Sequence, residues 1–264
     1  MTEHIIPPDN LDEIARKFGL GKYASVRTAE TPKQPLNNLE SGEFSVAEID
    51  DRYLLQHVRY GDGFVNVGIC KNLIDNGVNH TQEQFRDLTK SSEAKVGSSS
   101  LWASIINTLF DNKDGGYAGL VERIKGILVN DFDPKKPWMM TSTRVKYTPS
   151  GDIVVPDYCN DDSETINSDI VGDSTYLEPN QNLEPVTKAL LGIEDIAHFK
   201  ESINWLTGKR PHLRRLNSKP PSETERAVVL GANVNDFDIN VIGVYISNDV
   251  PARGVVVGAE KKTP

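Results

Sequence analysis

The spacing of hydrophobic residues predicts mainly helices in the first part of the chain. Residues 1–45 combine a short helical pattern with a proline- and asparagine-containing linker, which indicates a loop. The next hydrophobic positions fit a helix with mixed faces over residues 44–58: Val46, Ile49, Leu54, Leu55 and Val58.

Three further helices have clearer signals. A capping box predicts that a helix starts at Thr81, because Gln84 stands three residues later. Single hydrophobic stripes predict helices over residues 99–110 and 117–129. Stripes of this kind usually face a protein core rather than a cofactor.

After Pro134 the pattern changes from helical spacing to alternation. Residues 139–147 alternate, a turn follows at 149–151, and 153–155 start a return strand, which together predict a hairpin. The polar stretch 160–173 is expected to be a long loop with a short strand around Ile170. Two helices are expected over 183–191 and 195–206, separated by Gly192, and strands over 213–216, 226–232, 238–245 and 254–259.

This order of elements predicts an α+β fold with long loops, helices towards the N-terminus and irregular antiparallel β-structure towards the C-terminus. Residues 1–60 are expected to be an N-terminal extension or a small helical subdomain, and residues 61–264 the main domain. No internal repeat is visible.

Charge and composition narrow the range of partners. The net charge of −9 disfavours nucleic acid, because an acidic chain repels phosphate backbones. No membrane insertion is expected, since no apolar run is long enough and the N-terminus has no signal-peptide pattern. One basic cluster is expected to be a solvated rim near the start of a strand: Lys209, Arg210, His212, Arg214 and Arg215.

Motifs for catalysis or metal binding are missing from the sequence. No histidine has a second one at metal-ligand spacing, and Cys70 and Cys159, expected to be free and partly buried, form no metal-binding pair. Residues 111–116 and 160–164 resemble parts of calcium loops but lack the full register, so solvated loops are favoured. We therefore expect no catalytic residue, metal or cofactor.

The amino-acid usage near the C-terminus is unusual. Residues 227–259 contain no Lys, Glu, Gln, Met or Trp, although these types make up about 17% of the chain. A buried β-core would also exclude Lys, Glu and Gln, but it would not be so rich in Asn and Asp. Substitution of the adenines in an asparagine codon produces fifteen amino-acid types, and the five missing ones are not among them. The segment therefore has the composition of an asparagine-rich template randomised at adenines.

Several fixed motifs surround this segment. W-L-T-G stands at 205–208, R-L-N-S-K-P at 215–220, E-R at 225–226, R-G-V at 253–255 and E-K-K at 260–262. In these motifs, residues 135–262 resemble the variable proteins of diversity-generating retroelements, especially those of archaea and their viruses. The sequence departs from the family pattern at Arg214, where an aromatic residue is expected, and at Val256 and Val257, where a more polar pair is common.

The resemblance implies a C-type lectin fold with a variable region at about 227–257, whose varied side chains form one exposed ligand-binding patch. Alternation predicts that Ile239 and Val241 instead face inward. The expected diversified residues lie between 229 and 249: Val229, Gly231, Asn233, Val234, Asn235, Asp236, Phe237, Asp238, Asn240, Ile242, Gly243, Val244, Tyr245, Ser247, Asn248 and Asp249.

Three functions remain open at this stage. The resemblance favours a non-enzymatic display protein with diversified specificity, whose partner is an unidentified protein or surface ligand. One alternative is an attachment or structural protein of a virus particle or cell surface with fixed specificity. Another is an enzyme on the same fold, similar to formylglycine-generating oxidases, which would need a reactive cysteine pair.

Overall fold

The computed structural model describes residues 43–160, 164–166, 172–179, 183–242 and 249–259. The chain divides between Ser41 and Gly42, so all described residues belong to one compact unit. Its described part is α+β, with five α-helices and two β-sheets, which agrees with the expected class. It begins with strands, however, and not with the expected helix.

The segment 44–58 forms a β-hairpin, so the prediction of a helix there is wrong. Strand β1 (Ser45–Ile49) pairs antiparallel with β2 (Arg52–Tyr60). A bulge between Leu55 and Val58, with His57 at a φ of 62°, places both of these hydrophobic residues in the core. The bulge thereby produces a three-residue hydrophobic spacing that is typical of a helix.

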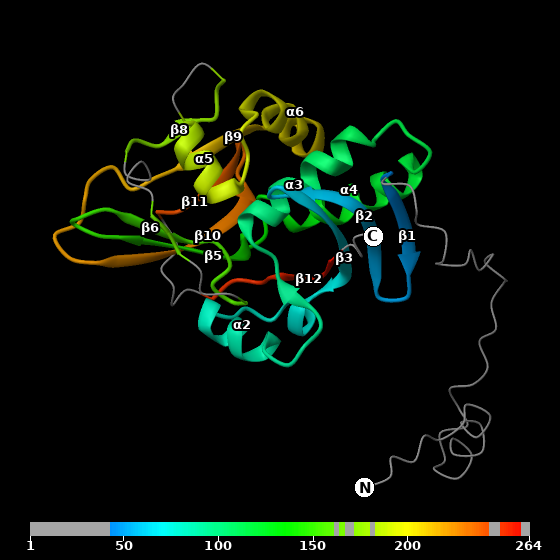
Figure 1. Ribbon diagram of the computed structural model, residues 1–264, viewed down its shortest axis with the longest axis horizontal. Coiled ribbons are helices and arrows are strands. Elements are labelled where there is room, and N and C mark those ends of the chain that lie inside the picture. Colours follow the sequence, from blue (N-terminus) through cyan, green and yellow to red (C-terminus); the bar gives the residue numbers. More distant parts are fainter. Residues whose placement is uncertain (1–42, 161–163, 167–171, 180–182, 243–248, 260–264) are drawn as a thin grey trace, which may run out of the picture. The chain divides into compact units, whose positions relative to one another are not determined.

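The first sheet has five strands in the order β1-β2-β3-β12-β4. Strand β3 (Gly63–Leu73) lies where the hydrophobic pattern predicted no element. Strand β12 (Arg253–Ala259) pairs antiparallel with β3 and with the short β4 (Lys95–Val96). Figure 1 shows this red C-terminal strand beside elements from the N-terminal half of the chain.

The second sheet has seven strands in the order β7-β6-β5-β10-β11-β9-β8. The expected hairpin is confirmed as β5 (Met139–Tyr147) and β6 (Asp152–Val155). The remaining strands are β7 (Thr165–Ile166), β8 (Thr175–Tyr176), β9 (Arg210–Arg214), β10 (Thr224–Ala232) and β11 (Asp236–Asn240). Pairing in this sheet is antiparallel except between β9 and β11, which run parallel, whereas irregular antiparallel β-structure was expected. Ile170 lies outside the described residues.

The five helices match the predictions closely. They are α2 (Gln82–Thr89), α3 (Ser99–Asp111), α4 (Ala118–Asp131), α5 (Glu184–Leu191) and α6 (Ile196–Thr207); a 3₁₀ turn covers Ile74–Gly77. The capping box of Thr81 and Gln84 is present at the start of α2. Gly192, at a φ of 63°, ends α5 in the left-handed conformation that glycine adopts without strain.

The larger of two hydrophobic clusters among the described residues joins most of these elements. It includes buried side chains from both sheets and from α3 to α6, with Trp102 of α3 fully buried. A buried ion pair also connects distant elements, because both carboxylate oxygens of Asp131 in α4 accept hydrogen bonds from Arg253 in β12. The same guanidinium donates to the backbone oxygens of Cys70 and Lys71 in β3. The C-terminal strand is thus fastened to the N-terminal half by both backbone and side chains.

Candidate ligand-binding site

Strand β11, within the anomalous segment, has one apolar and one polar face. Phe237 and Ile239 are fully buried in the main core, as is Val241 directly after the strand. The expectation that Ile239 and Val241 face inward is therefore confirmed. Successive side chains of a strand point to opposite faces, so Asp236, Asp238 and Asn240 lie on the other face.

The turn between β10 and β11 is exposed and held by its own side chains. Oδ1 of Asn233 accepts hydrogen bonds from the backbone N–H of Asn235 (2.7 Å) and of Asp236 (2.8 Å). Nζ of Lys209 donates to the backbone oxygens of Asn233 and Val234 at 2.6 and 2.7 Å. Val234, at 82% exposed, points into solvent at the tip. The turn therefore presents side chains from a fixed backbone.

The polar face of β11 meets the side chains of the parallel strand β9. Asp238 lies opposite His212 in the register, and its Oδ1 is 3.2 Å from Nδ1 of that histidine. Nε of Arg214 lies 3.0 Å from the same oxygen, and Nδ2 of Asn233 donates to Oδ2 at 2.8 Å. These neighbours leave Asp238 with no exposed surface.

Asp236 stands two residues before Asp238 on the same face and exposes only 8% of its surface. Its Oδ1 is buried, and no hydrogen-bond donor reaches it from the part of the chain that the structure describes. Ligand atoms of His212, Asp236 and Asp238 all lie within 4.8 Å of one another, the one group of at least three potential metal ligands among the described residues.

This group was not predicted from the sequence, and we call it the β9–β11 cluster: His212, Asp236 and Asp238. No histidine has a second one at metal-ligand spacing in the sequence, and the basic residues 209–215 were expected to form a solvated rim. The available signal was the period-two spacing of Arg210, His212 and Arg214 together with that of Asp236, Asp238 and Asn240. Their pairing could not be deduced, because it depends on the parallel contact of two strands that are distant in sequence.

The expectation of an exposed patch is correct for only part of the segment. Asn235 and Asp249 are exposed like Val234, while Asn233 and Ile242 are half-buried. Exposure was wrongly expected for six residues, all of which are buried: Val229, Gly231, Asp236, Phe237, Asp238 and Asn240. Five expected site residues lie outside the described residues: Gly243, Val244, Tyr245, Ser247 and Asn248.

Strand β10 is buried because a strand pairs with each of its edges and a hydrophobic cluster covers each of its faces. It lies between β5 and β11 in the sheet. Val229 packs with Met140 and Phe85 in a second hydrophobic cluster, on the face opposite Val228 and Leu230. A Cβ atom at Gly231 would lie 2.5 Å from Cδ1 of Trp138, so the indole occupies the space of a side chain there.

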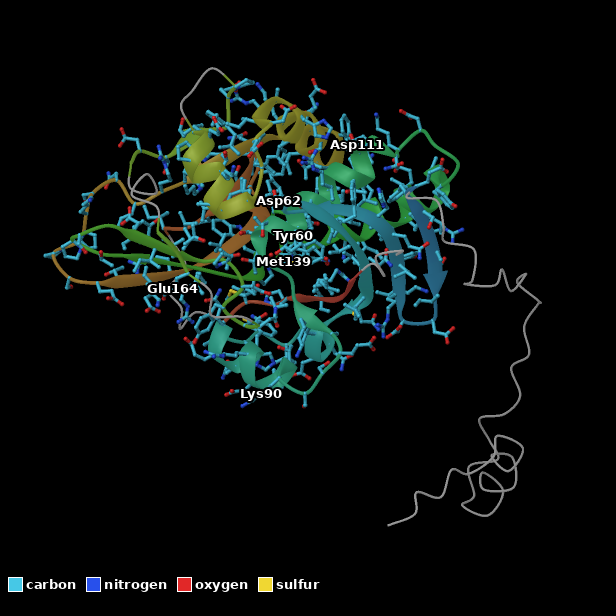
Figure 2. The ribbon with its side chains drawn as sticks, viewed as in Figure 1. Tyr60, Asp62, Lys90, Asp111, Met139 and Glu164 are labelled. Carbon is cyan, nitrogen blue, oxygen red and sulfur yellow. The ribbon has the colours of Figure 1, made fainter. Side chains whose placement is uncertain are left out.

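The surface of the described residues includes hollows in two regions. One hollow of about 320 Å³ is lined by Lys209 and Arg210, and by Lys200 and Glu201 of α6, and adjoins the exposed turn through Lys209. The other consists of two hollows of about 590 and 480 Å³ that share Gly61, Ser104, Lys188 and Gly192. Figure 2 labels Tyr60, Asp62 and Asp111 on the elements that border this second region.

The two cysteines, which the enzyme alternative requires, are free, with Cys159 buried and Cys70 half-buried. Burial is the main cause that raises the pKa of both thiols, that of Cys159 to about 12. A raised pKa disfavours the nucleophilic thiolate.

Comparison with protein-family models, with curated proteins and with solved structures found no match. Within the described ranges, no helix is long and apolar enough to cross a membrane.

Proposed function

We propose that this chain is a non-enzymatic ligand-display protein whose C-terminal segment is diversified by adenine-directed mutagenesis, on a C-type lectin fold. Among the described residues, the display surface consists of the turn 233–235, Ile242 and Asp249. The hollow beside Lys209 and Arg210 offers a concave surface next to that turn. Ligand pockets generally combine such a depression with a few polar groups.

The observation that carries the proposal is the absence of the five amino-acid types that adenine mutagenesis of asparagine codons cannot produce. The contrast between the buried strand β11 and the exposed turn before it adds support. A protein that tolerates many substitutions must separate its core from its varied positions. Phe237 and Ile239 belong to the core, while the turn that precedes them is exposed.

A second candidate is an attachment or structural protein of fixed specificity. The burial of Asp238 and Asn240 favours it, because freely varied positions are normally exposed and each substitution there changes stability by only about 0.5 kcal/mol. This candidate requires one constant partner for all natural variants of the chain.

Binding measurements on natural variants distinguish the two candidates. Purified variants that differ only between residues 229 and 249 would be applied to the same arrays of glycans and surface proteins. Diversified display predicts that the bound ligand changes from variant to variant. One shared ligand for every variant would contradict it.

The matched control changes an exposed residue outside the segment. Leu88 on α2 is 47% exposed, so Leu88→Ser should leave the binding profile of each variant unchanged. A change of ligand with Leu88→Ser would move the binding surface away from the proposed segment.

A further inference from the structure

The β9–β11 cluster has the composition and spacing of a metal site. We propose that His212, Asp236 and Asp238 bind one divalent transition-metal ion of the zinc class, with a coordination position left open to solvent or to a bound ligand. The proposal depends only on the geometry of two strands, and not on how the sequence of the segment arose.

The distance between the first two ligand atoms fits a shared ion. Nδ1 of His212 and Oδ1 of Asp238 lie 3.2 Å apart. Two ligand atoms at the usual distances from one tetrahedral zinc ion are separated by about 3.4 Å. The third ligand atom lies within 4.8 Å of both, so the carboxylate of Asp236 needs a shift of at most about 1.4 Å to complete the site.

The unpartnered oxygen of Asp236 is independent evidence for a ligand. A buried carboxylate is costly without a donor or a cation, and Oδ1 receives no hydrogen bond from the described residues. Asp238, by contrast, already receives one from Asn233 and faces Arg214. A divalent ion would satisfy Asp236 and use the oxygen that Asp238 turns towards His212.

The positively charged side chains near the cluster leave space for such an ion. Nζ of Lys209 is engaged by two backbone oxygens, and the guanidinium of Arg210 lies over the ring of Tyr176 at 4.1 Å. An ion beside Asp238 would displace the buried Nε of Arg214, and the exposed 36% of that side chain gives it a route to solvent. Two carboxylates and a neutral imidazole then balance the charge of the ion.

The chemical types of the ligand atoms indicate which class of metal ion the cluster binds. Imidazole nitrogen favours zinc and its neighbours in the transition series, whereas Ca²⁺ and Mg²⁺ prefer sites made of oxygen alone. Three protein ligands with a free fourth position are typical of zinc sites that also bind a water molecule or a substrate group. The cluster lies beside the exposed turn, because Asn233 of that turn donates a hydrogen bond to Asp238.

The test is a titration of the full chain, stripped of metal with EDTA, with ZnCl₂ by calorimetry and with CoCl₂ by visible absorption. We expect one Zn²⁺ per chain and the absorption of four-coordinate Co²⁺. Asp236→Asn keeps the shape of the side chain and should weaken binding at least about tenfold, because the loss of even an outer partner of a ligand costs that much. His212→Asn should do the same.

His198→Asn is the matched control, since His198 also lies beside a carboxylate, 3.1 Å from Asp111, but outside the cluster. It should bind Zn²⁺ like the unaltered chain. Thermal melting in EDTA establishes that Asp236→Asn is folded. Zn²⁺ affinity weaker than about 1 mM, or equal affinity in the unaltered chain and the folded Asp236→Asn variant, would overturn the proposal.

Discussion

At the scale of single residues, Gly231 limits what the anomalous segment can vary. The indole of Trp138 occupies the place of a side chain at this position, and β10 is buried on both faces. Gly231→Ala should therefore lower the free energy of unfolding by about 1–3 kcal/mol, the usual effect of overpacking a core. Urea denaturation measures this change.

The matched control is Gly258→Ala on β12, where an added Cβ atom meets nothing within 4 Å. Its free energy of unfolding should stay within about 0.5 kcal/mol of that of the unaltered chain. If both variants were equally stable, the contact between Gly231 and Trp138 would not restrict the position.

At the scale of elements, β11 belongs to the buried part of the protein and the turn before it belongs to the surface. Ile239 is fully buried, so Ile239→Ala should cost about 2–5 kcal/mol of unfolding free energy. Val234, in the turn before the strand, is 82% exposed, and Val234→Ala should change the same quantity by no more than about 0.5 kcal/mol. Denaturant unfolding of both variants measures these changes. Similar losses of unfolding free energy in the two variants would contradict the assignment of Ile239 to the core and Val234 to the surface.

The local hydrophobic pattern of each element decided whether the sequence could predict it. Helices α3 and α4 were predicted from a single hydrophobic stripe each, and α2 from its capping box. The hairpin β1–β2 was mistaken for a helix because a bulge between Leu55 and Val58 disturbs the alternation. Local patterns thus predict regular elements, whereas a bulge changes the very periodicity on which the prediction depends.

At the scale of the whole molecule, the candidate site depends on contacts between distant segments. The separation of Ile239 from the polar face was predictable, because it follows from alternation alone. The burial of Val229 and Asp238 was not, since it depends on β5 and β9, which pair with β10 and β11. The β9–β11 cluster has the same origin, as His212 meets Asp238 only through a parallel strand pair.

The central proposal, diversification of the C-terminal segment, is tested most directly by DNA sequencing. The measurement compares the DNA that encodes residues 227–259, in many members of one population, with any near-copy of it beside a reverse-transcriptase gene. The proposal predicts such a copy, with differences confined to positions where the copy has adenine. Differences spread over all four bases of the copy, or a segment that never varies, would contradict it.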